Sequence, residues 1–99
     1  MINFSKIVGF SWDDGNSRKS FEKHNVSQGE AEQTFFNDPL LLLPDENHSN
    51  KEARCHAYGK TDKDRKLHIV FTLRQGDTLI RVISARDMHR KERVTYDNA

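Results

Sequence analysis

The sequence predicts an α+β fold with two helices near the N-terminus, an antiparallel β-sheet and a C-terminal helix. Three observations support this prediction. Ser27 and Glu30 have the spacing of a helix capping box, residues 52–58 alternate between large polar and small side chains, and residues 75–78 have the composition of a tight turn between two apolar strands. The 99 residues suit one core, so we expect a single domain over residues 1–99.

The N-terminal half is expected to contain two strands and two helices. A short strand over residues 7–12 precedes a helix that starts at Asp13 or Asp14 and ends near His24, where Asn25 can adopt the left-handed conformation of a helix end. The capping box begins the second helix, which Asp38 and Pro39 terminate. The apolar run of residues 40–43 is typical of a buried strand, and residues 44–51 of a polar loop.

The alternating segment predicts a strand with two different faces. One face would carry Glu52, Arg54, His56 and Tyr58, and the other Ala53, Cys55 and Ala57. We expect the small residues to face the core and Cys55 to be an inert core residue. A polar turn over residues 59–66 should follow this strand.

A hairpin is predicted from the strand of residues 67–74 onward. Gly76 would occupy the first central position of a type II′ turn. This turn sets the register of the two strands. The expected pairs are Leu73 with Ile80, Phe71 with Val82, Ile69 with Ser84, Thr72 with Arg81, Arg74 with Leu79 and His68 with Ala85. Residues 88–97 should form a surface helix that places His89, Arg93 and Tyr96 close together, with Glu92 beside Tyr96.

Charge and cysteine usage restrict the class of protein. The formal net charge is only +1, which is low for a protein that binds a polyanion, but the arginines of the last third can still form a local basic surface. Cys55 is the only cysteine, and the chain does not open like a secretory signal. The longest apolar run is far shorter than the ~20 residues of a membrane span. We therefore expect a cytoplasmic protein without a membrane segment.

The residue spacing argues against several kinds of chemistry. The five histidines lack the spacing of metal ligands, so we expect no metal and no cofactor, although isolated histidines suit acid and base roles. No glycine-rich phosphate loop is present, and Ser49 lacks the pattern around a catalytic serine. The predicted register places Arg81 beside Thr72 on a charged sheet face. This face could bind phosphate, or it could be a solvated surface with ion pairs.

Several motifs occur together in a specific order. They are Trp12-Asp13, residues 23–27 (Lys-His-Asn-Val-Ser), residues 36–39 (Phe-Asn-Asp-Pro), His48-Ser49, Glu52 with Arg54, residues 80–86 (Ile-Arg-Val-Ile-Ser-Ala-Arg) and Glu92-Arg93 with Tyr96. From about Phe10 to Tyr96 this order resembles the BrnT toxin family. The chain departs from the family at three positions, with Asn25 in place of the usual Gly, Ser20 in place of a frequent Asn, and Asn16 in place of a frequent Lys.

The resemblance implies a RelE-like fold, RNA cleavage, and neutralisation by a BrnA-like antitoxin. This antitoxin would have a ribbon-helix-helix domain, form a complex of two toxins and two antitoxins, and bind its own promoter DNA. RelE-like nucleases use the ribose 2′-hydroxyl of the substrate to attack the adjacent phosphate. The protein then supplies a base, an acid and positive charge, without a metal.

The matching positions suggest a role for each candidate site residue. Arg81 and Arg86 would bind phosphate and stabilise transition-state charge, and they converge only if their strand ends or bulges before Arg86. The candidate proton-transfer groups are Glu52, His24 and Lys23. Arg54, Glu92, Arg93 and Tyr96 would position the substrate, or else dock the last helix.

Two other functions fit the same residues. The leading alternative is a noncatalytic interaction module, such as a transcriptional co-repressor, because the net charge is modest. A metal-dependent nuclease is the second. Cleavage of RNA in the presence of a chelator distinguishes the ribonuclease from both. The low net charge also leads us to expect cleavage of free RNA, without a requirement for the ribosome.

Overall fold

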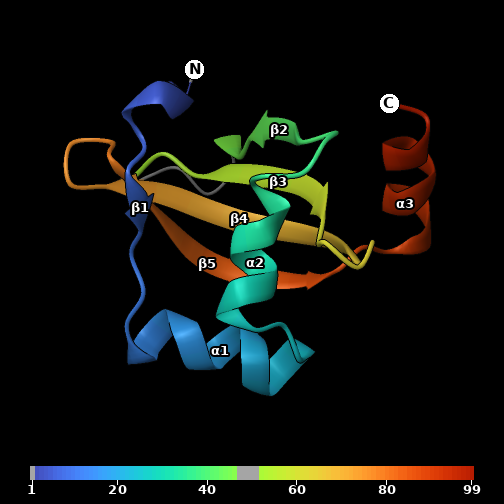
Figure 1. Cartoon of the computed structure of the whole chain (residues 1–99), viewed down its shortest axis with the longest axis horizontal. Helices are drawn as coiled ribbons and strands as arrows, with labels where there is room; N and C mark the ends of the chain where they lie inside the picture. Colours follow the sequence, from blue (N-terminus) through green and yellow to red (C-terminus); the bar gives the residue numbers. More distant parts are fainter. Residues whose placement is uncertain (1, 47–51) are drawn as a thin grey trace.

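A computed structural model of the chain describes residues 2–46 and 52–99. These residues form a five-stranded sheet in the order β1-β5-β4-β3-β2, with α2 across one face and α3 beyond the ends of the long strands (Figure 1). In chain order the elements are η1 Phe4–Lys6, β1 Gly9–Phe10, α1 Asp14–His24, α2 Gln28–Thr34, β2 Leu41–Pro44, β3 Cys55–Lys60, β4 Lys66–Arg74, β5 Leu79–Asp87 and α3 Arg90–Asp97. The α+β prediction is confirmed. The His48-Ser49 motif lies outside the described residues.

Both N-terminal helices begin as predicted, and α1 also ends as predicted, whereas α2 ends at Thr34, before the predicted stop at Asp38 and Pro39. Asp13 accepts hydrogen bonds from the backbone N–H groups of the first turn of α1, and Asn25 ends this helix with a φ of 56°. Ser27 and Glu30 form a reciprocal capping box at the start of α2. The two helix starts and the end of α1 depend on contacts between residues that are close in sequence, so the sequence was sufficient to predict them.

The first strand is shorter than predicted, and its direction was not foreseen. Only Gly9 and Phe10 pair with β5, and they do so in parallel, whereas the other neighbouring strands are antiparallel. Beyond this pair the chain turns into α1. The rest of this edge of β5 is therefore not covered by β1.

Helix α1 provides hydrogen bonds to the uncovered edge of β5. The Asn16 side-chain amide donates to the Val82 carbonyl at 3.0 Å, and the Ser20 hydroxyl accepts from the backbone N–H of Ala85 at 2.9 Å. Both side chains are buried. The two residues at which the chain departs from the BrnT pattern within α1 thus satisfy backbone groups of an edge strand, which would otherwise be open to pairing.

The core lies between the sheet and helices α1 and α2. Phe35 packs edge to face on Phe71, with ring centroids 5.2 Å apart. The buried apolar cluster comprises Val26, Ala31, Ala57, Leu67, Ile69, Phe71, Ile80, Val82 and Ala85. Alternate residues of β3, β4 and β5 therefore point to the opposite face, which we call the outer face. Its members include His56, Tyr58, His68, Thr72, Arg74, Arg81 and Arg86.

The hairpin of β4 and β5 confirms the predicted register near the turn only. The observed pairs from Arg74 with Leu79 to Phe71 with Val82 match the prediction. A bulge then shifts the pairing by one residue, so that His68 lies opposite Arg86, and not opposite Ala85 as predicted.

The type of turn in this hairpin was predicted wrongly. Gln75, Gly76 and Asp77 all have positive φ values, of 56°, 64° and 67°. The backbone N–H of Thr78 donates to the Arg74 carbonyl at 3.1 Å. A type II′ turn would have positive φ at its first central residue alone. A longer loop, with three residues in the left-handed conformation, therefore connects β4 and β5 and keeps the predicted pairing next to the turn.

Two predictions about burial were also wrong. Residues 40–43 were expected to form a buried strand, but β2 is an edge strand and Leu43 is 55% exposed. Ala53 precedes β3 and is exposed, so it does not face the core. Cys55 packs against the core as predicted, and burial raises the pKa of its thiol.

Helix α3 is anchored more firmly than a surface helix. Tyr96 is buried and donates a hydrogen bond of 2.5 Å to the Pro39 carbonyl, while Arg93 donates to the Met88 carbonyl at 2.8 Å. Glu92 forms a bidentate contact with Arg86, which was not predicted. In the described parts of the chain, no helix is both long and apolar enough to cross a membrane.

Candidate active site

The outer face holds charged residues at both ends of the long strands. At the hairpin end, both Nη atoms of Arg81 contact the Asp13 carboxylate, at 3.1 and 3.2 Å. This contact lowers the pKa of Asp13. Arg74 forms an ion pair with Glu52 nearby. Thus Glu52, a predicted proton-transfer group, lies at the same end of the sheet as Arg81.

The opposite end of the outer face, near α3, holds Arg86. Its two Nη atoms donate to the two oxygens of Glu92 at 2.9 and 3.0 Å, and one of them also donates to the Asp87 carbonyl at 2.9 Å. The bidentate contact with Arg86 is the main reason that the pKa of Glu92 is lowered to about 2. Glu92 therefore remains ionised at neutral pH.

Two histidines join the strands beside Arg86. The Nδ1 atom of His56 lies 2.7 Å from Nε2 of His68, and the ring planes differ by 17°. Rings stacked face to face would keep their atoms about 3.5 Å apart. The two imidazoles therefore lie nearly in one plane, and the hydrogen bond runs within that plane.

The histidine pair has charged and aromatic neighbours. The other nitrogen of His56, Nε2, lies 3.3 Å from a carboxylate oxygen of Asp45, and the Tyr58 ring stacks on His68 with centroids 4.6 Å apart. Burial and the positive charge of Arg86 lower the pKa of His68 to about 4. His68 is therefore neutral at neutral pH.

The alternating pattern of residues 52–58 predicted His56 on the correct face but did not pair it with His68. The signal that was missing is the register of β3 against β4, in which Tyr58 lies opposite His68. This register cannot be deduced from strand composition alone.

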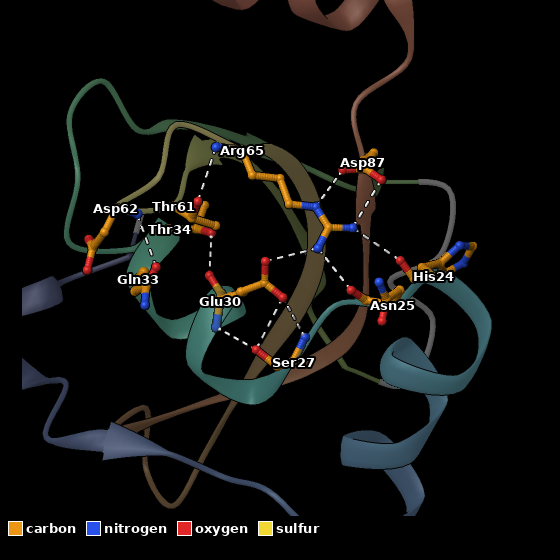
Figure 2. Close-up of polar contacts among 10 residues, drawn as sticks. All are labelled: His24, Asn25, Ser27, Glu30, Gln33, Thr34, Thr61, Asp62, Arg65 and Asp87. Carbon is orange, nitrogen blue, oxygen red and sulfur yellow. Dashed lines mark hydrogen bonds and ion pairs between the residues drawn. The ribbon is translucent and has the colours of Figure 1, made fainter.

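The structure brings only some of the predicted site residues together. Lys23 and His24 lie in the last turn of α1, outside the sheet, and Lys23 is exposed. The imidazole of His24 points away from the Arg65 guanidinium (Figure 2). His24 is nevertheless close enough to Asp87, at the end of β5, to contribute to lowering the pKa of that carboxyl.

Arg65 is a residue that the sequence analysis did not single out. It donates to both oxygens of Asp87, to Glu30, and to the backbone carbonyls of His24 and Asn25 (Figure 2). These five hydrogen bonds match the five N–H donors of a guanidinium group. Arg65 thus joins the end of α1, the start of α2 and the end of β5, and its role is structural.

Arg81 and Arg86 share the outer face but not a binding position. We expected Arg81 and Arg86 to converge only if their strand ended or bulged before Arg86, and this bulge is present. Five residues of an extended strand nevertheless place their Cα atoms roughly 15 Å apart, and the guanidinium groups bind different carboxylates. Of the predicted positioning residues, Glu92 lies beside Arg86, Arg54 precedes β3, and Arg93 and Tyr96 anchor α3.

The arrangement can supply positive charge and proton transfer. Within residues 2–46 and 52–99, no three His, Cys, Asp or Glu side chains are placed to hold a metal ion. The outer face combines arginines with the His68 imidazole, which is neutral at neutral pH. Arginines bind phosphate, and neutral imidazoles accept protons.

The comparison with protein families identifies the class of protein. Residues 12–92 match a family described as the ribonuclease toxin, BrnT, of a type II toxin-antitoxin system. The class is therefore a ribonuclease toxin of a type II toxin-antitoxin system. Because the match spans most of the sequence, the chain belongs to the BrnT family, as the motifs of the sequence suggested. No curated protein matches it.

Proposed function

We propose that this RelE-like chain is a cytoplasmic endoribonuclease that cuts RNA without a metal ion, and that the outer face of its sheet is the active site. The observation that carries the proposal is the placement of Arg81 and Arg86 on one face together with titratable side chains. Family membership supplies the class of reaction.

The proposed reaction uses the substrate's own nucleophile. A base on the protein removes the proton of a ribose 2′-hydroxyl, the 2′ oxygen bonds to the adjacent phosphorus, and the bond to the 5′ oxygen breaks. That oxygen takes a proton from an acid. The products are a 2′,3′-cyclic phosphate and a 5′-hydroxyl.

Arginine would stabilise the negative charge that develops on the phosphate oxygens. Arg86 uses three of its five N–H donors within the fold. Two donors therefore remain for a phosphate, even with Glu92 in place. Glu92 would then hold the guanidinium in position, and Arg81 would contact a second phosphate along the strand.

The proton-transfer roles of Glu52, His24 and Lys23 remain proposals. Glu52 lies at the hairpin end through its ion pair with Arg74. His24 and Lys23 lie on α1. Of the two, His24 acts on the charge of Asp87 at the end of β5. Arg54, Glu92, Arg93 and Tyr96 are proposed to position the substrate or the elements that hold it.

The proposed partners are an RNA substrate and a BrnA-like ribbon-helix-helix antitoxin. Two copies of each protein would form a complex that binds its own promoter DNA. Co-expression with the product of a neighbouring short reading frame should restore the growth of cells that make this chain. A neighbour without any protective effect would contradict the antitoxin assignment.

A double variant tests the site. Replacing Arg81 and Arg86 by Ala should abolish growth inhibition, because both phosphate contacts are lost, while circular dichroism shows a folded protein. The matched control replaces two exposed arginines, Arg18 and Arg90, by Ala. It makes the same change in net charge and should remain toxic. Full toxicity of the Arg81/Arg86 variant would exclude the outer face as the site.

A further inference from the structure

Asp45, His56 and His68 form a line of three groups that the proposed roles above do not use. The line ends next to Arg86, because His68 and Arg86 lie opposite each other in β4 and β5. We propose that Nδ1 of His68 is the general base of RNA cleavage, and that His56 and Asp45 are positioning residues that take up the charge of the accepted proton. This inference rests on the proposed function.

The carboxylate sets the direction of the hydrogen bonds. A carboxylate only accepts, so Asp45 favours a proton on the Nε2 atom of His56, 3.3 Å away. With its proton on Nε2, His56 would have a lone pair on Nδ1 to accept the Nε2 proton of His68 across 2.7 Å. Neutral His68 is left with its lone pair on Nδ1, as a base requires.

The Nδ1 atom of His68 is the ring nitrogen that the histidine pair leaves for a substrate proton. It makes no hydrogen bond with any of the residues that the structure describes. Fully buried nitrogens without a hydrogen-bond partner are rare. Among the described residues, Nδ1 of His68 is not one of them. This nitrogen is therefore not completely enclosed, although His68 as a whole is only 7% exposed.

The histidine pair allows the positive charge of the accepted proton to move away from Arg86. A positive charge on His68 is disfavoured by burial and by Arg86, which lower the pKa of His68 to about 4. When Nδ1 of His68 takes the proton of the 2′-hydroxyl, the Nε2 proton of His68 can pass to Nδ1 of His56. The positive charge then lies on His56, beside the Asp45 carboxylate, where it is favoured.

The proton balance is complete. The 2′-hydroxyl proton ends on His68, the former Nε2 proton of His68 ends on His56, and the 2′ oxygen bonds to phosphorus as the bond to the 5′ oxygen breaks. An acid or water protonates the leaving oxygen, and water then removes the extra proton of the pair. The other charged or titratable groups near the pair are Arg86, Glu92, His89 and Tyr58.

The test compares purified variants in chelator on an RNA of defined sequence. His68→Gln keeps a side-chain N–H for His56 but removes the base, so kcat should fall by about 10²- to 10⁴-fold. Binding to the same RNA with a 2′-deoxyribose at the cut position should be unchanged. The control Glu22→Gln changes an exposed side chain of α1 and should cut at the wild-type rate.

Asp45→Asn tests the positioning role through the pH profile. Without the carboxylate the protonated pair is less stable, so the acidic limb of the kcat/KM profile should move to lower pH by about 1 to 3 units. The plateau should also fall, because the base is weaker. In the wild type, the ring ¹⁵N shifts should show His68 protonated on Nε2 and not on Nδ1 at neutral pH.

Each outcome decides between the proposals. A His68→Gln variant that cuts at the wild-type rate, or the opposite tautomer in the wild type, overturns the relay and leaves cleavage by the 2′-hydroxyl intact. Lower activity of Asp45→Asn without a shifted acidic limb overturns the positioning role. A wild-type protein that cuts no RNA overturns the proposed function as well. The NMR result decides the case even if a variant fails to fold.

Discussion

Arg65 and Arg86 contact carboxylates near the same end of the sheet, but they differ in the number of donors that the fold uses. All five side-chain N–H groups of Arg65 donate hydrogen bonds, to Asp87, to Glu30 and to two backbone carbonyls. Arg86 keeps two for a ligand. Counting donors therefore separates an arginine that holds the fold together from one that can bind phosphate.

The pair of Glu92 and Arg86 should make stability depend on acid. The folded state lowers the pKa of Glu92 to about 2 from a usual value of 4.5. Its stabilisation is therefore complete above pH 4.5 and is lost as the pH falls toward 2. Glu92→Gln lacks this titration. The wild type should lose about 1–2 kcal/mol more than this variant between about pH 5 and pH 2, after allowance for solvent screening.

Urea unfolding at a series of pH values measures this difference. Glu22→Gln, at an exposed position of α1, is the matched control and should follow the wild type. Parallel curves for the wild type and Glu92→Gln would show that the ion pair with Arg86 adds no stability.

At the scale of elements, side chains of α1 form hydrogen bonds to the edge of β5 that a neighbouring strand would otherwise form. The Ser20 hydroxyl accepts the backbone N–H of Ala85 in a buried position. Ser20→Ala should therefore lower the free energy of unfolding by about 1–3 kcal/mol, because a buried donor loses its partner. The neighbouring exposed Lys19 offers a control, and Lys19→Ala should have little effect. Wild-type stability of Ser20→Ala in urea would mean that water or a backbone shift replaces the bond.

The same scale shows which parts of the fold the sequence could predict. Helix caps at Asp13 and Ser27 were predictable because the groups that bond are at most three residues apart. The register next to the hairpin turn was also predictable, even with the wrong turn type, since alternation of core and outer residues fixes which pairs share a face. The parallel pairing of β1 was not, because two residues carry no directional pattern.

The bulge in β5 explains most of the error in the candidate site. Val82 and Ile83 are both apolar, so the sequence does not show where the alternation shifts by one residue. Without the shift, His68 would lie opposite Ala85, and Arg86 would be on the core face. The sequence thus led us to propose Arg81 and Arg86 as site residues, but it could not predict that His68 lies beside Arg86.

At the scale of the whole molecule, charge is distributed unevenly although its sum is small. The net charge of +1 gives little attraction to the dense phosphates of a ribosome. Arg86 can still bind a single strand of RNA locally, because the contacts within the described fold use only three of its five N–H donors, although Glu92 balances its charge. We therefore expect free RNA to be the substrate.

The most direct test of the central claim is product analysis of a defined, naked RNA incubated with purified protein in chelator. Mass spectrometry should find a 2′,3′-cyclic phosphate and a 5′-hydroxyl at the cut. A single 2′-deoxyribose at that position should abolish the cut. Cleavage that needs an added metal ion, that persists at the 2′-deoxy position, or that occurs only on translating ribosomes would contradict the account.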